Sequence, residues 1–577
     1  MATTIRRATF VLVGCLSFAF VPVADDLDTF IQAQMAQRQI NGLSLAVIQD
    51  GKIQARAYGV TTRGGAPVTT ETLFQAGSIS KSVAAMGAMK LVEQGTLSLD
   101  QDVNARLKTW KVPENEFTKT EKVTLRRLLS HTAGLTVHGF PGYDVSERLP
   151  STVQVLDGAG NTPAVRVDVV PGSLSRYSGG GFTVTQQLVC DVTGKPFADY
   201  MGESVLKPIG MTRSTYQQPL PADRAAETAS GHAADRTAVP GKWHVYPEMA
   251  AAGLWTTATD LAKFAVEIQQ SLAGKSRLVV SQATTKQMLT MERNDYGLGL
   301  ALKGTGEART FGHNGRDAGF DALMLAFAAT GQGVVVMINA NDNSGMMNRI
   351  TEFVAKKYSW PARSTEAPAA TARLTPAIAL DTVTGRYELS NNNMVTLTAH
   401  GDSLFTDVNG LPDEEFVFMG DDRFGSTDRN VSFRIARDAA GEVIGLGWSG
   451  NGSERQIPRI GPLFAAIKPT ADPSPAFTQR VNAAVRALAR GAAASALQLL
   501  TPGARANFAD RQIRDFAGVG TLTYLSAQDV TGRRIERHGG TVARVLFYRM
   551  GTEEGDRWLL VHVTSDNLIT DYDVVDK

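Results

Sequence analysis

The amino-acid sequence predicts a mixed α/β (α+β) domain with an antiparallel sheet. An all-β domain and a small α+β domain follow it. Its 577 residues suit several domains of ordinary size. Two proline-containing junctions separate three regions with different patterns of apolar residues. Helical and strand-like segments alternate in the first region, short strands fill the second, and helices precede strands in the third. We place the boundaries at 1–24 for a signal peptide, 25–360 for the first domain, 361–380 for a linker, 381–465 for the β domain and 474–577 for the last domain.

Charge and composition exclude several classes of protein. The chain carries 58 Lys and Arg residues against 57 Asp and Glu residues, so no basic surface is expected for a nucleic acid. Its 43% of hydrophobic residues is ordinary for packed globular domains. Cys15 and Cys190 are the only cysteines, which rules out a disulfide framework and a Cys-based metal site. Because no nucleotide-binding loop, dinucleotide fingerprint or His-Glu-x-x-His sequence is present, we expect no metal, no cofactor and no nucleic-acid partner.

The N-terminal segment has the pattern of an export signal. Arg6 and Arg7 precede an apolar run, residues 8–24, which ends at two acidic residues. The protein is therefore expected to be periplasmic or secreted. Two alternatives stay open: the run could attach the chain to a membrane, or residues 12–15, Leu-Val-Gly-Cys, could act as a lipoprotein signal that lipidates Cys15.

Both ends of the first domain contribute predicted strands. Asp50-Gly51 separates two strand-like runs and is a strong hairpin signal. A second pair of strands precedes a helical pattern near the end of the domain. This order predicts a sheet whose first and last strands come from opposite ends of the domain, with the N- and C-terminal helices packed on it. The predicted segments are strands at 43–49, 52–60, 318–327 and 333–339 and a helix at 346–358.

The two later domains differ in the order of their elements. Regularly spaced short strands in the second domain predict a small β-sandwich or barrel. The third domain begins with an alanine-rich helical stretch and continues with strands. The second domain has predicted strands at 385–389, 394–399, 403–405, 416–419, 431–435 and 443–448, and the third has helices at 477–500 and 505–516 and strands at 522–526, 543–548, 558–563 and 568–572.

The strongest chemical signal is Gly-Ser-Ile-Ser-Lys-Ser at residues 77–82. It opens a predicted helix that runs to Gln94 and stops at Gly95. Residues three apart share one helix face, so Ser78 and Lys81 can touch. The helix is apolar nearly all round, and burial would lower the pKa of Lys81 until it can take the proton of the serine hydroxyl. The pattern predicts a nucleophilic serine with a lysine as its base.

Two glycine-rich segments could bring further groups to this serine. Residues 175–182 place Tyr177 on a tight loop before a helix expected to begin near Thr183, and a tyrosine there can relay a proton. Residues 311–320 place His313 at the start of a strand, where a neighbouring backbone N–H could face a developing oxyanion. Taken alone, each segment also fits a plain turn that carries a packing aromatic or a surface histidine.

Ser-x-x-Lys, Tyr-Ser and His-x-Gly in this order and spacing resemble the penicillin-recognising serine hydrolases, which include class C β-lactamases, low-molecular-weight penicillin-binding proteins, esterases and D-amino-acid peptidases. The resemblance covers residues 27–358. It is supported by Leu-Leu-Ser-His-Thr-Ala-Gly-Leu at 128–135, Lys-Pro-Ile-Gly-Met at 207–211 and Gly-Leu-Trp-Thr-Thr at 253–257. It implies a β-lactamase/transpeptidase-like domain, with an antiparallel sheet flanked by helices, an all-helical lobe, and the serine at their junction.

The same resemblance implies roles for individual residues. Ser78 matches the acylated nucleophile, Lys81 the lysine that helps to activate it, and Tyr177 the tyrosine of the second motif. The backbone N–H groups of Ser78 and Arg316 match the oxyanion hole. His131 is expected to be structural, because it ends a predicted helix before a turn.

Two departures from the family pattern bear on the substrate. His313, Gly315 and Arg316 match the substrate-binding strand, but β-lactamases carry lysine at the position of His313. Histidine is mostly neutral at pH 7 and attracts a carboxylate less strongly than lysine does. The usual asparagine after Tyr-Ser is Gly179 here, which removes one contact to a substrate amide. Both changes favour ester or peptide hydrolysis over efficient β-lactamase activity.

The sequence therefore predicts an exported serine hydrolase that acts through an acyl-enzyme on small peptides or esters. The resemblance also admits D-residue peptides and linearised cyclic peptides as substrates. Three alternatives stay open: a β-lactamase, a D-Ala-D-Ala carboxypeptidase, and a penicillin-binding sensor without turnover. The second domain resembles the lipocalin-like domain appended to many of these hydrolases, and the last resembles a nuclear-transport-factor-like cone. Both are expected to pack, dimerise or cover the cleft, and no pattern indicates an oligomeric state.

Overall fold

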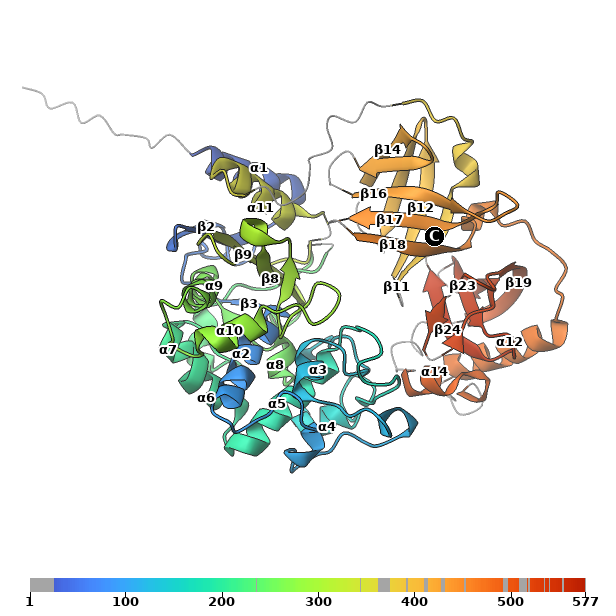
Figure 1. Ribbon diagram of the computed structural model, residues 1–577. Helices are drawn as coiled ribbons and strands as arrows, with labels where there is room; N and C mark the ends of the chain where they lie inside the picture. Colours follow the sequence, from blue (N-terminus) through green and yellow to red (C-terminus); the bar gives the residue numbers. More distant parts are fainter. Residues whose placement is uncertain are drawn as a thin grey trace, which may run out of the picture.

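The computed structural model describes residues 25–575 apart from short gaps (Figure 1). A mixed α/β domain, a β-barrel and a smaller α+β module follow one another along the chain, in agreement with the predicted fold classes. The predicted signal peptide and most of the predicted linker lie outside the described residues. In the described part of the chain, no helix combines the length and apolarity needed to span a membrane. The gaps are 235, 343, 362–373, 391–392, 409–413, 427–430, 451–452, 491–496, 508–515, 517–518, 534, 539 and 553–554.

The first domain is built on a six-stranded antiparallel sheet. Its strands are β1 (Gly42–Gln49), β2 (Lys52–Gly59), β7 (Ala301–Lys303), β8 (Thr310–Asp317), β9 (Phe320–Phe327) and β10 (Gly333–Ile338). They lie in the order β2-β1-β10-β9-β8-β7. Strand β1 pairs with β10, which confirms that the two ends of the domain meet in the sheet. Asp50 and Gly51 close the first hairpin with φ values of 52° and 72°, the left-handed region that a two-residue turn of this kind requires.

Helices cover both faces of this sheet. The helices of the first domain are α1 (Asp26–Arg38), α2 (Ile79–Glu93), α3 (Leu125–Leu129), α4 (Thr152–Leu156), α5 (Gly179–Thr193), α6 (Phe197–Met201), α7 (Lys207–Ile209), α8 (Met249–Ala252), α9 (Ala258–Leu272), α10 (Gln282–Met288) and α11 (Met346–Lys357). Alternate side chains of a strand point to opposite faces. Leu45 and Val47 of β1 therefore share a core with α1 and α11, whereas Ala46 and Ile48 share the other core with α2 and α9.

Helix α2 runs through the middle of the domain and is buried on nearly all sides, as its apolar sequence predicts. Gly95 follows its end with a φ of 72° and stops the helix in the left-handed conformation. The chain before α2 is held by two contacts. The Ala76 N–H donates to the carbonyl of Leu254 at 2.9 Å, and β3 (Phe74–Gln75) pairs with β6 (Trp255–Thr256). The Gly-Leu-Trp-Thr-Thr segment found in the sequence thus fixes the entry to α2.

Helix α5 begins earlier than the sequence pattern predicts. It starts at Gly179 and not near Thr183. Ser178 caps the helix, because its Oγ accepts a hydrogen bond from the Gly181 N–H at 2.9 Å. The earlier start places Tyr177 directly before the first turn of a buried helix.

The second domain is a closed barrel, which decides between the predicted sandwich and barrel. Its strands are β11 (Gly385–Ser390), β12 (Asn393–His400), β13 (Ser403–Val408), β14 (Glu414–Gly420), β15 (Arg423–Ser426), β16 (Val431–Arg437), β17 (Val443–Gly450) and β18 (Ser453–Gly461). Each strand pairs with the next, and β18 returns to pair with β11. Phe416, Phe424 and Phe433 meet in the barrel core, with ring centroids 5.0 and 5.3 Å apart.

The last module places helices against a four-stranded antiparallel sheet. Its main elements are α12 (Pro475–Ala489), α14 (Pro502–Asn507), β19 (Val519–Asp529), β22 (Arg544–Thr552), β23 (Gly555–Val563) and β24 (Ile569–Val575), with a short pair β20 (Glu536–Arg537) and β21 (Gly540–Thr541). The sheet order is β19-β22-β23-β24. The first predicted helix is shorter than expected, ending at Ala489, and most of the second predicted helix lies outside the described residues.

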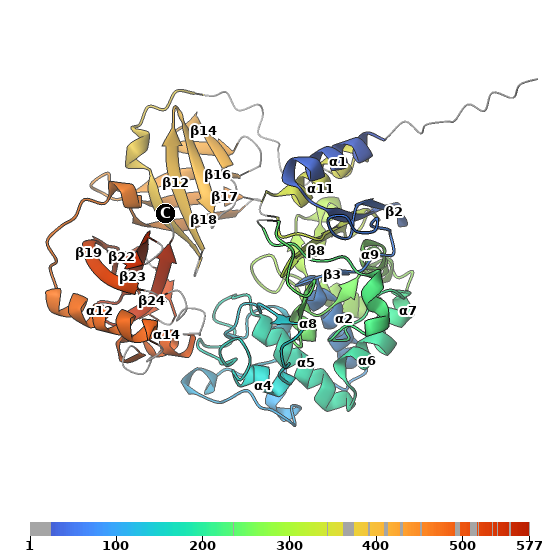
Figure 2. The ribbon, with the colours of Figure 1, turned by 180° about the vertical axis from the view of Figure 1, so that it is seen from behind.

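The barrel and the last module share one buried interface. Ile460 and Phe464, at the end of the barrel, lie in an apolar cluster with Phe547 and Leu560 of the last sheet. Phe464 stacks on Trp558 with 4.8 Å between ring centroids. Both views of the ribbon show the barrel directly above the last module (Figures 1 and 2).

A buried ionic cluster joins the same two regions. Arg537 is fully buried, and its guanidinium donates to Glu388 of β11 at 3.1 and 2.6 Å. It also donates to Asp571 at 3.0 Å and to Asp573 at 2.7 Å, and His562 contacts Asp573 at 2.7 Å. One buried guanidinium therefore balances the charge of three carboxyl groups.

Arg537→Met should destabilise the barrel and the last module together. The substitution keeps the volume but leaves three buried carboxyl groups without their cation, a change that costs about 3–5 kcal/mol in buried ion pairs. Urea unfolding of the full chain, followed by circular dichroism and tryptophan fluorescence, measures the loss. Arg549→Met is the matched control, because Arg549 pairs with Asp556 at 3.8 Å on the surface of the same module and should change stability by less than about 1 kcal/mol. Equal effects of the two substitutions would contradict a special role for Arg537.

Candidate active site

Ser78 and Lys81 meet at the N-terminus of α2. Ser78 is the residue that precedes the helix, and its side chain is half-buried. Lys81 lies one turn further on, where its Nζ donates to Ser78 Oγ at 3.0 Å and to the carbonyl of Ala251 at 2.7 Å. The lysine is only 2% exposed. The predicted Ser–Lys contact is thus present. The serine is partly exposed to solvent, and the lysine is buried.

Burial changes the charge of this lysine. It lowers the pKa of Lys81 to about 7, and the carboxyl group of Asp317 opposes the change. An amine with such a pKa is half deprotonated at neutral pH. Because a neutral amine can accept a proton, Lys81 is able to act as a base toward Ser78.

Tyr177 faces this pair from the loop before α5. Its ring centroid lies 5.0 Å from Lys81 Nζ. Burial raises the pKa of the phenol, while proximity to Ser78 acts in the opposite direction. The phenolic oxygen is buried and has no hydrogen-bond partner of regular geometry. Tyr177 therefore stays protonated at neutral pH and has a hydroxyl free to move a proton beside Ser78.

The edge of β8 touches the turn that carries Ser78. A Cβ on Gly315 would lie 1.9 Å from the carbonyl oxygen of Ala76, and a Cβ on Gly77 would lie 2.4 Å from the Arg316 nitrogen. Gly77 also has a φ of 51°. Only glycine fits at either position. The contact places the main chain at Arg316 against the turn that carries Ser78.

The histidine of the third motif lies on the same strand. The ring of His313 lies 5.9 Å from that of Tyr177, and its Nδ1 is 2.5 Å from the carbonyl oxygen of Asn314. A carbonyl only accepts, so Nδ1 carries the proton and Nε2 is an acceptor. Burial and the charge of Lys81 lower the pKa of His313 to about 4. His313 is therefore neutral at pH 7, as the sequence predicts.

The Arg316 side chain does not add a free charge to the site. Its guanidinium donates to Asp321 at 2.7 and 2.6 Å and to the carbonyl of Asp342 at 3.0 Å. The position of Gly179 is also filled, because a Cβ there would lie 3.0 Å from the Phe140 ring and 3.1 Å from the carbonyl oxygen of His138. A side chain at position 179 would therefore press on the loop at 138–140.

His131, expected from the sequence to be structural, lies inside the site. Its ring is 4.2 Å from that of Tyr177, and its Nδ1 accepts a hydrogen bond from the Ser178 N–H at 3.1 Å. Burial holds its pKa well below the usual range. His131 supports the loop that carries Tyr177, so the structural expectation agrees with its contacts although its place is central.

Sequence reasoning missed further groups around the site. Tyr296 packs against His131 and His313 at 4.8 and 6.0 Å. Glu248 and Asp317 are buried carboxyl groups behind Lys81, being 0% and 4% exposed. The charge of Asp317 acts on Lys81, and that of Glu248 acts on Asp317. The sequence around Asp317 gives no signal of this role. The signal for Glu248 is an acidic residue directly before an apolar segment.

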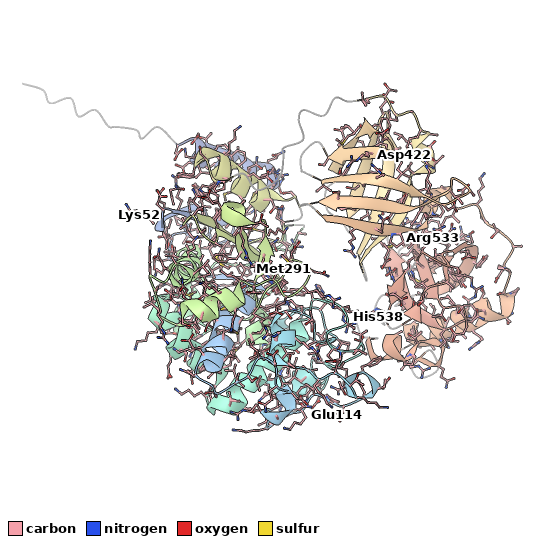
Figure 3. The ribbon with its side chains drawn as sticks, in the orientation of Figure 1. Lys52, Glu114, Met291, Asp422, Arg533 and His538 are labelled. Atoms are coloured by element: carbon pink, nitrogen blue, oxygen red, sulfur yellow. The ribbon has the colours of Figure 1, made fainter. Side chains whose placement is uncertain are left out.

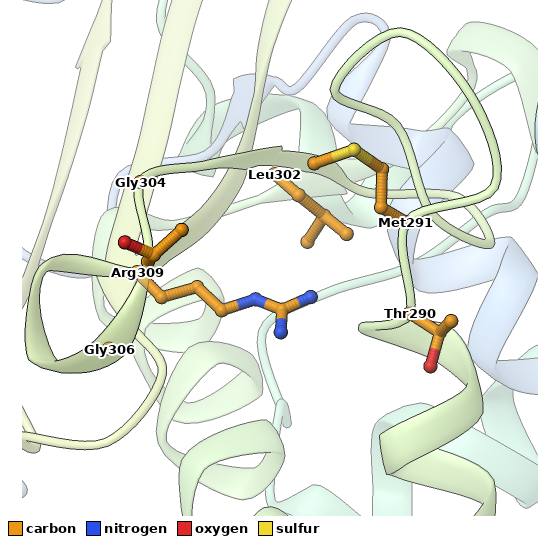
Figure 4. A pocket seen from close by; sticks show the side chains of 7 residues that line it. Thr290, Met291, Leu302, Gly304, Gly306 and Arg309 are labelled. Carbon is orange, nitrogen blue, oxygen red and sulfur yellow. The ribbon is translucent and has the colours of Figure 1, made fainter.

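A metal site and a second pocket are the other features to consider in the first domain. Among the described residues, no cluster of three or more His, Cys, Asp or Glu side chains could hold a metal ion. Figure 4 shows a pocket of about 390 Å³ beside β7. Arg309 extends across it and donates to the carbonyl of Leu289. The lining, which contains none of the predicted site residues, is Thr290, Met291, Leu302, Gly304, Thr305, Gly306 and Arg309.

The fold and the Ser–Lys contact define the class of the protein. A serine before a buried helix, a lysine one turn on, and an antiparallel sheet beside a helical region together characterise an active-site serine hydrolase. Residues 27–358 match the family described as Beta-lactamase, and the chain belongs to this family.

Individual relatives agree with this membership. The chain is 28% identical over 325 residues to "Penicillin-binding protein 4" of Amycolatopsis lactamdurans, in an alignment covering 54% of this chain and 83% of that protein. It is 22% identical over 443 residues to "Penicillin-binding protein 4*" of Bacillus subtilis (strain 168), which covers 72% and 95%. The octameric penicillin-binding protein homologue from Pyrococcus abyssi has a similar fold, with a TM-score of 0.50, 22% identity, and 75% and 99% of the two chains covered.

Glu248→Gln should make the protein more stable at pH 8 than the wild type. Burial raises the pKa of Glu248 to about 8 from its ordinary 4.5, so the folded state holds a proton that the unfolded state releases above pH 4.5. The free energy of unfolding therefore falls as pH rises from 4.5 to 8, by up to about 1.4 kcal/mol per pH unit. Glutamine is neutral in both states and removes this fall.

Urea unfolding at pH 5 and pH 8 measures the difference. The control is Glu114→Gln, an exposed glutamate labelled in Figure 3, which should leave the pH dependence unchanged. If Glu248→Gln and the wild type lose the same stability between pH 5 and pH 8, the carboxyl group is not held neutral in the folded protein.

Proposed function

We propose that this serine hydrolase is exported and cleaves small peptides or esters through an acyl-enzyme, with Ser78 as nucleophile and Lys81 as its base. The observation that carries the proposal is the 3.0 Å hydrogen bond between Lys81 Nζ and Ser78 Oγ in a site that lowers the pKa of the lysine to about 7. Tyr177 relays protons, and the backbone N–H groups of Ser78 and Arg316 hold the oxyanion.

Acylation begins with one proton transfer. The neutral amine of Lys81 takes the proton of the Ser78 hydroxyl while Oγ forms a bond to the substrate carbonyl carbon. The carbonyl π electrons move to oxygen, and the two backbone N–H groups stabilise the negative charge. When the tetrahedral intermediate collapses, the bond to the leaving group breaks. Tyr177 gives its proton to that group and takes one from Lys81.

Deacylation repeats these steps with water as the nucleophile. The Tyr177–Lys81 relay removes a proton from the water, which forms a bond to the acyl carbon. The bond from that carbon to Ser78 Oγ breaks, and the serine regains its proton. Because the lysine ends each half-reaction in its starting state, the cycle needs no cofactor.

The site offers no free positive charge to a substrate carboxylate, so we expect it to prefer substrates that do not need a carboxylate for binding. His313 is neutral at pH 7, and the Arg316 guanidinium is already paired with Asp321. Gly179 offers no side-chain amide, and the neighbouring loop fills its space. Esters and small peptides, including D-residue or linearised cyclic peptides, fit this chemistry. The names of the relatives favour a second candidate, penicillin binding with or without turnover, or D-Ala-D-Ala carboxypeptidase activity.

The flanking regions enter the proposal in supporting roles. The apolar run at 8–24 directs the chain out of the cytoplasm, to the periplasm or medium, with lipidation at Cys15 or a membrane anchor as variants. We take the eight-stranded barrel to be a lipocalin-like domain and the last module to be a nuclear-transport-factor-like domain, as the sequence resemblance implies; a closed barrel and a four-stranded sheet are compatible with this. We assign them to packing against one another and to shaping access to substrate, not to the chemistry.

Ser78→Ala should abolish covalent labelling by a fluorophosphonate, and Lys81→Ala should slow it by several orders of magnitude. The two residues serve one step, so the double variant should be scarcely slower than either single one. Tyr177→Phe should lower ester turnover with little change in melting temperature, because the ring remains. Intact-mass spectrometry and peptide mapping give the readout.

Ser82→Ala is the matched control on the same helix. Ser82 Oγ is tied to the carbonyl of Gly299 at 2.7 Å, so this variant should be labelled at the wild-type rate. An adduct on Ser80 or Ser82 in the wild type would show that Ser78 is not the nucleophile. Labelling of Lys81→Ala at the wild-type rate would remove the lysine from the mechanism.

A cephalosporin should acylate the enzyme more slowly than its best ester or peptide substrate. The physical reason is that neutral His313 offers no fixed positive charge to the cephalosporin carboxylate. The same cephalosporin as its methyl ester should therefore react as fast as the free acid. Stopped-flow acylation rates compare the two forms. A large advantage for the free acid, or turnover equal to that of the best ester, would contradict the preference.

A further inference from the structure

The pocket beside β7 lies outside the serine site. Its volume is about 390 Å³, which is within the range of sites for small molecules. Arg309 crosses it, with Leu302 and Met291 along one side and Thr290 beyond the guanidinium (Figure 4). A ligand in this pocket would touch none of the side chains that carry the proposed chemistry at Ser78.

Two segments form the walls of the pocket. The loop after α10 contributes Thr290 and Met291, and β7 with the turn that follows it contributes Leu302 and residues 304–306. The Leu302 N–H donates to the carbonyl of Asp295 at 2.7 Å, which ties the loop to the strand. Because the two walls are joined through the main chain, the fold itself sets their spacing.

Arg309 is held in place before any ligand arrives. Its backbone carbonyl accepts a hydrogen bond from the Ala328 N–H at 2.8 Å, and its guanidinium donates to the carbonyl of Leu289, the residue that caps the end of α10. Gly304 and Gly306 have φ values of 69° and 57°, so the turn before Arg309 uses the left-handed conformation that glycine adopts without strain. A side chain fixed in this way loses little conformational entropy on binding.

The charge of Arg309 has no counter-ion in the described part of the chain. None of the described carboxyl groups forms an ion pair with it, although Glu307 lies on the same turn. A guanidinium has several N–H donors in a planar fork, and the hydrogen bond to Leu289 uses one of them. The donors that remain match the geometry of a carboxylate, which can accept two parallel hydrogen bonds.

The lining favours a small acid with an apolar body over an inorganic anion. Among the described residues that line the pocket, Arg309 is the one cation, and the apolar side chains beside it are Leu302 and Met291. One guanidinium and an apolar wall do not replace the hydration of a multiply charged phosphate. A monocarboxylate needs one such partner, and its hydrocarbon part would cover Met291, which is 50% exposed.

We propose that this pocket is a second ligand site, which binds a small monocarboxylate. Arg309 holds the carboxylate, while Leu302 and Met291 contact the apolar body of the ligand. The inference goes beyond the proposed function, because binding here requires neither an acyl-enzyme nor the hydroxyl of Ser78.

The test is binding of phenylacetate to the full chain, compared with binding of phenethyl alcohol. The two molecules have nearly the same size and the same ring, but the alcohol carries no charge. Methionine-methyl NMR locates the binding: the Met291 signal, assigned with Met291→Leu, should shift and saturate as phenylacetate is added. The alcohol should bind at least about tenfold more weakly, as expected for loss of a charge-assisted hydrogen bond.

Two arginine variants separate the pocket guanidinium from surface charge in general. Arg309→Met removes the charge but keeps an apolar side chain, so it should weaken phenylacetate binding by at least about tenfold and leave binding of the alcohol unchanged. Arg277→Met is the matched control, because Arg277 is an exposed arginine of the same domain, paired with Glu93 at 3.0 Å. This control should bind both probes as the wild type does.

The outcomes that overturn the proposal are direct. A Met291 signal that does not move in millimolar phenylacetate would exclude the site. Equal affinity for the acid and the alcohol, or unchanged binding of phenylacetate to Arg309→Met, would exclude recognition of the carboxylate by Arg309. Ser78→Ala should bind phenylacetate as the wild type does, so failure of the proposed hydrolysis and failure of this site are separate results.

Discussion

The close approach of strand β8 to the turn before α2 is the contact on which the rest of the first domain depends. A Cβ at Gly315 would lie 1.9 Å from a backbone oxygen, so the two segments touch through their main chains alone. Together with the pairing of β3 and β6, this contact fixes where α2 enters the domain, and so which residues are buried one turn later. The positions of Ser78 and Lys81 at the start of α2 therefore depend on how this helix packs against the strand.

Electrostatic neutrality is the second organising feature of the site. Burial moves almost every titratable group near Ser78 toward its uncharged form: histidines lose protons, while Tyr177 and Glu248 keep theirs. Low dielectric makes any isolated charge expensive. Against this background Lys81, with a pKa of about 7, is the group that changes charge most easily near neutral pH. The surroundings therefore favour proton exchange at Lys81, beside Ser78.

Much of this arrangement could be predicted from sequence, and the successes share a cause. The Ser78–Lys81 contact follows from three-residue spacing on a helix, and the first hairpin follows from Asp50-Gly51, so short-range geometry decides both. The roles of Glu248 and Asp317 depend on segments far apart in sequence that only the fold brings together. The early start of α5 depends on a cap made by Ser178, which the apolar pattern does not show. The ionic cluster at Arg537 joins partners 149 residues apart, beyond any local pattern.

That cluster has a consequence for the barrel on its own. Glu388 sits in the barrel wall, and its guanidinium partner belongs to the last module. Without the last module, Glu388 would lose its guanidinium partner, and apolar residues of the shared cluster such as Ile460 would lose their cover. Retaining the barrel alone would then require a compensating change at residue 388. In this chain, loss of the last module would therefore destabilise the barrel, whereas the hydrolase domain carries its own core.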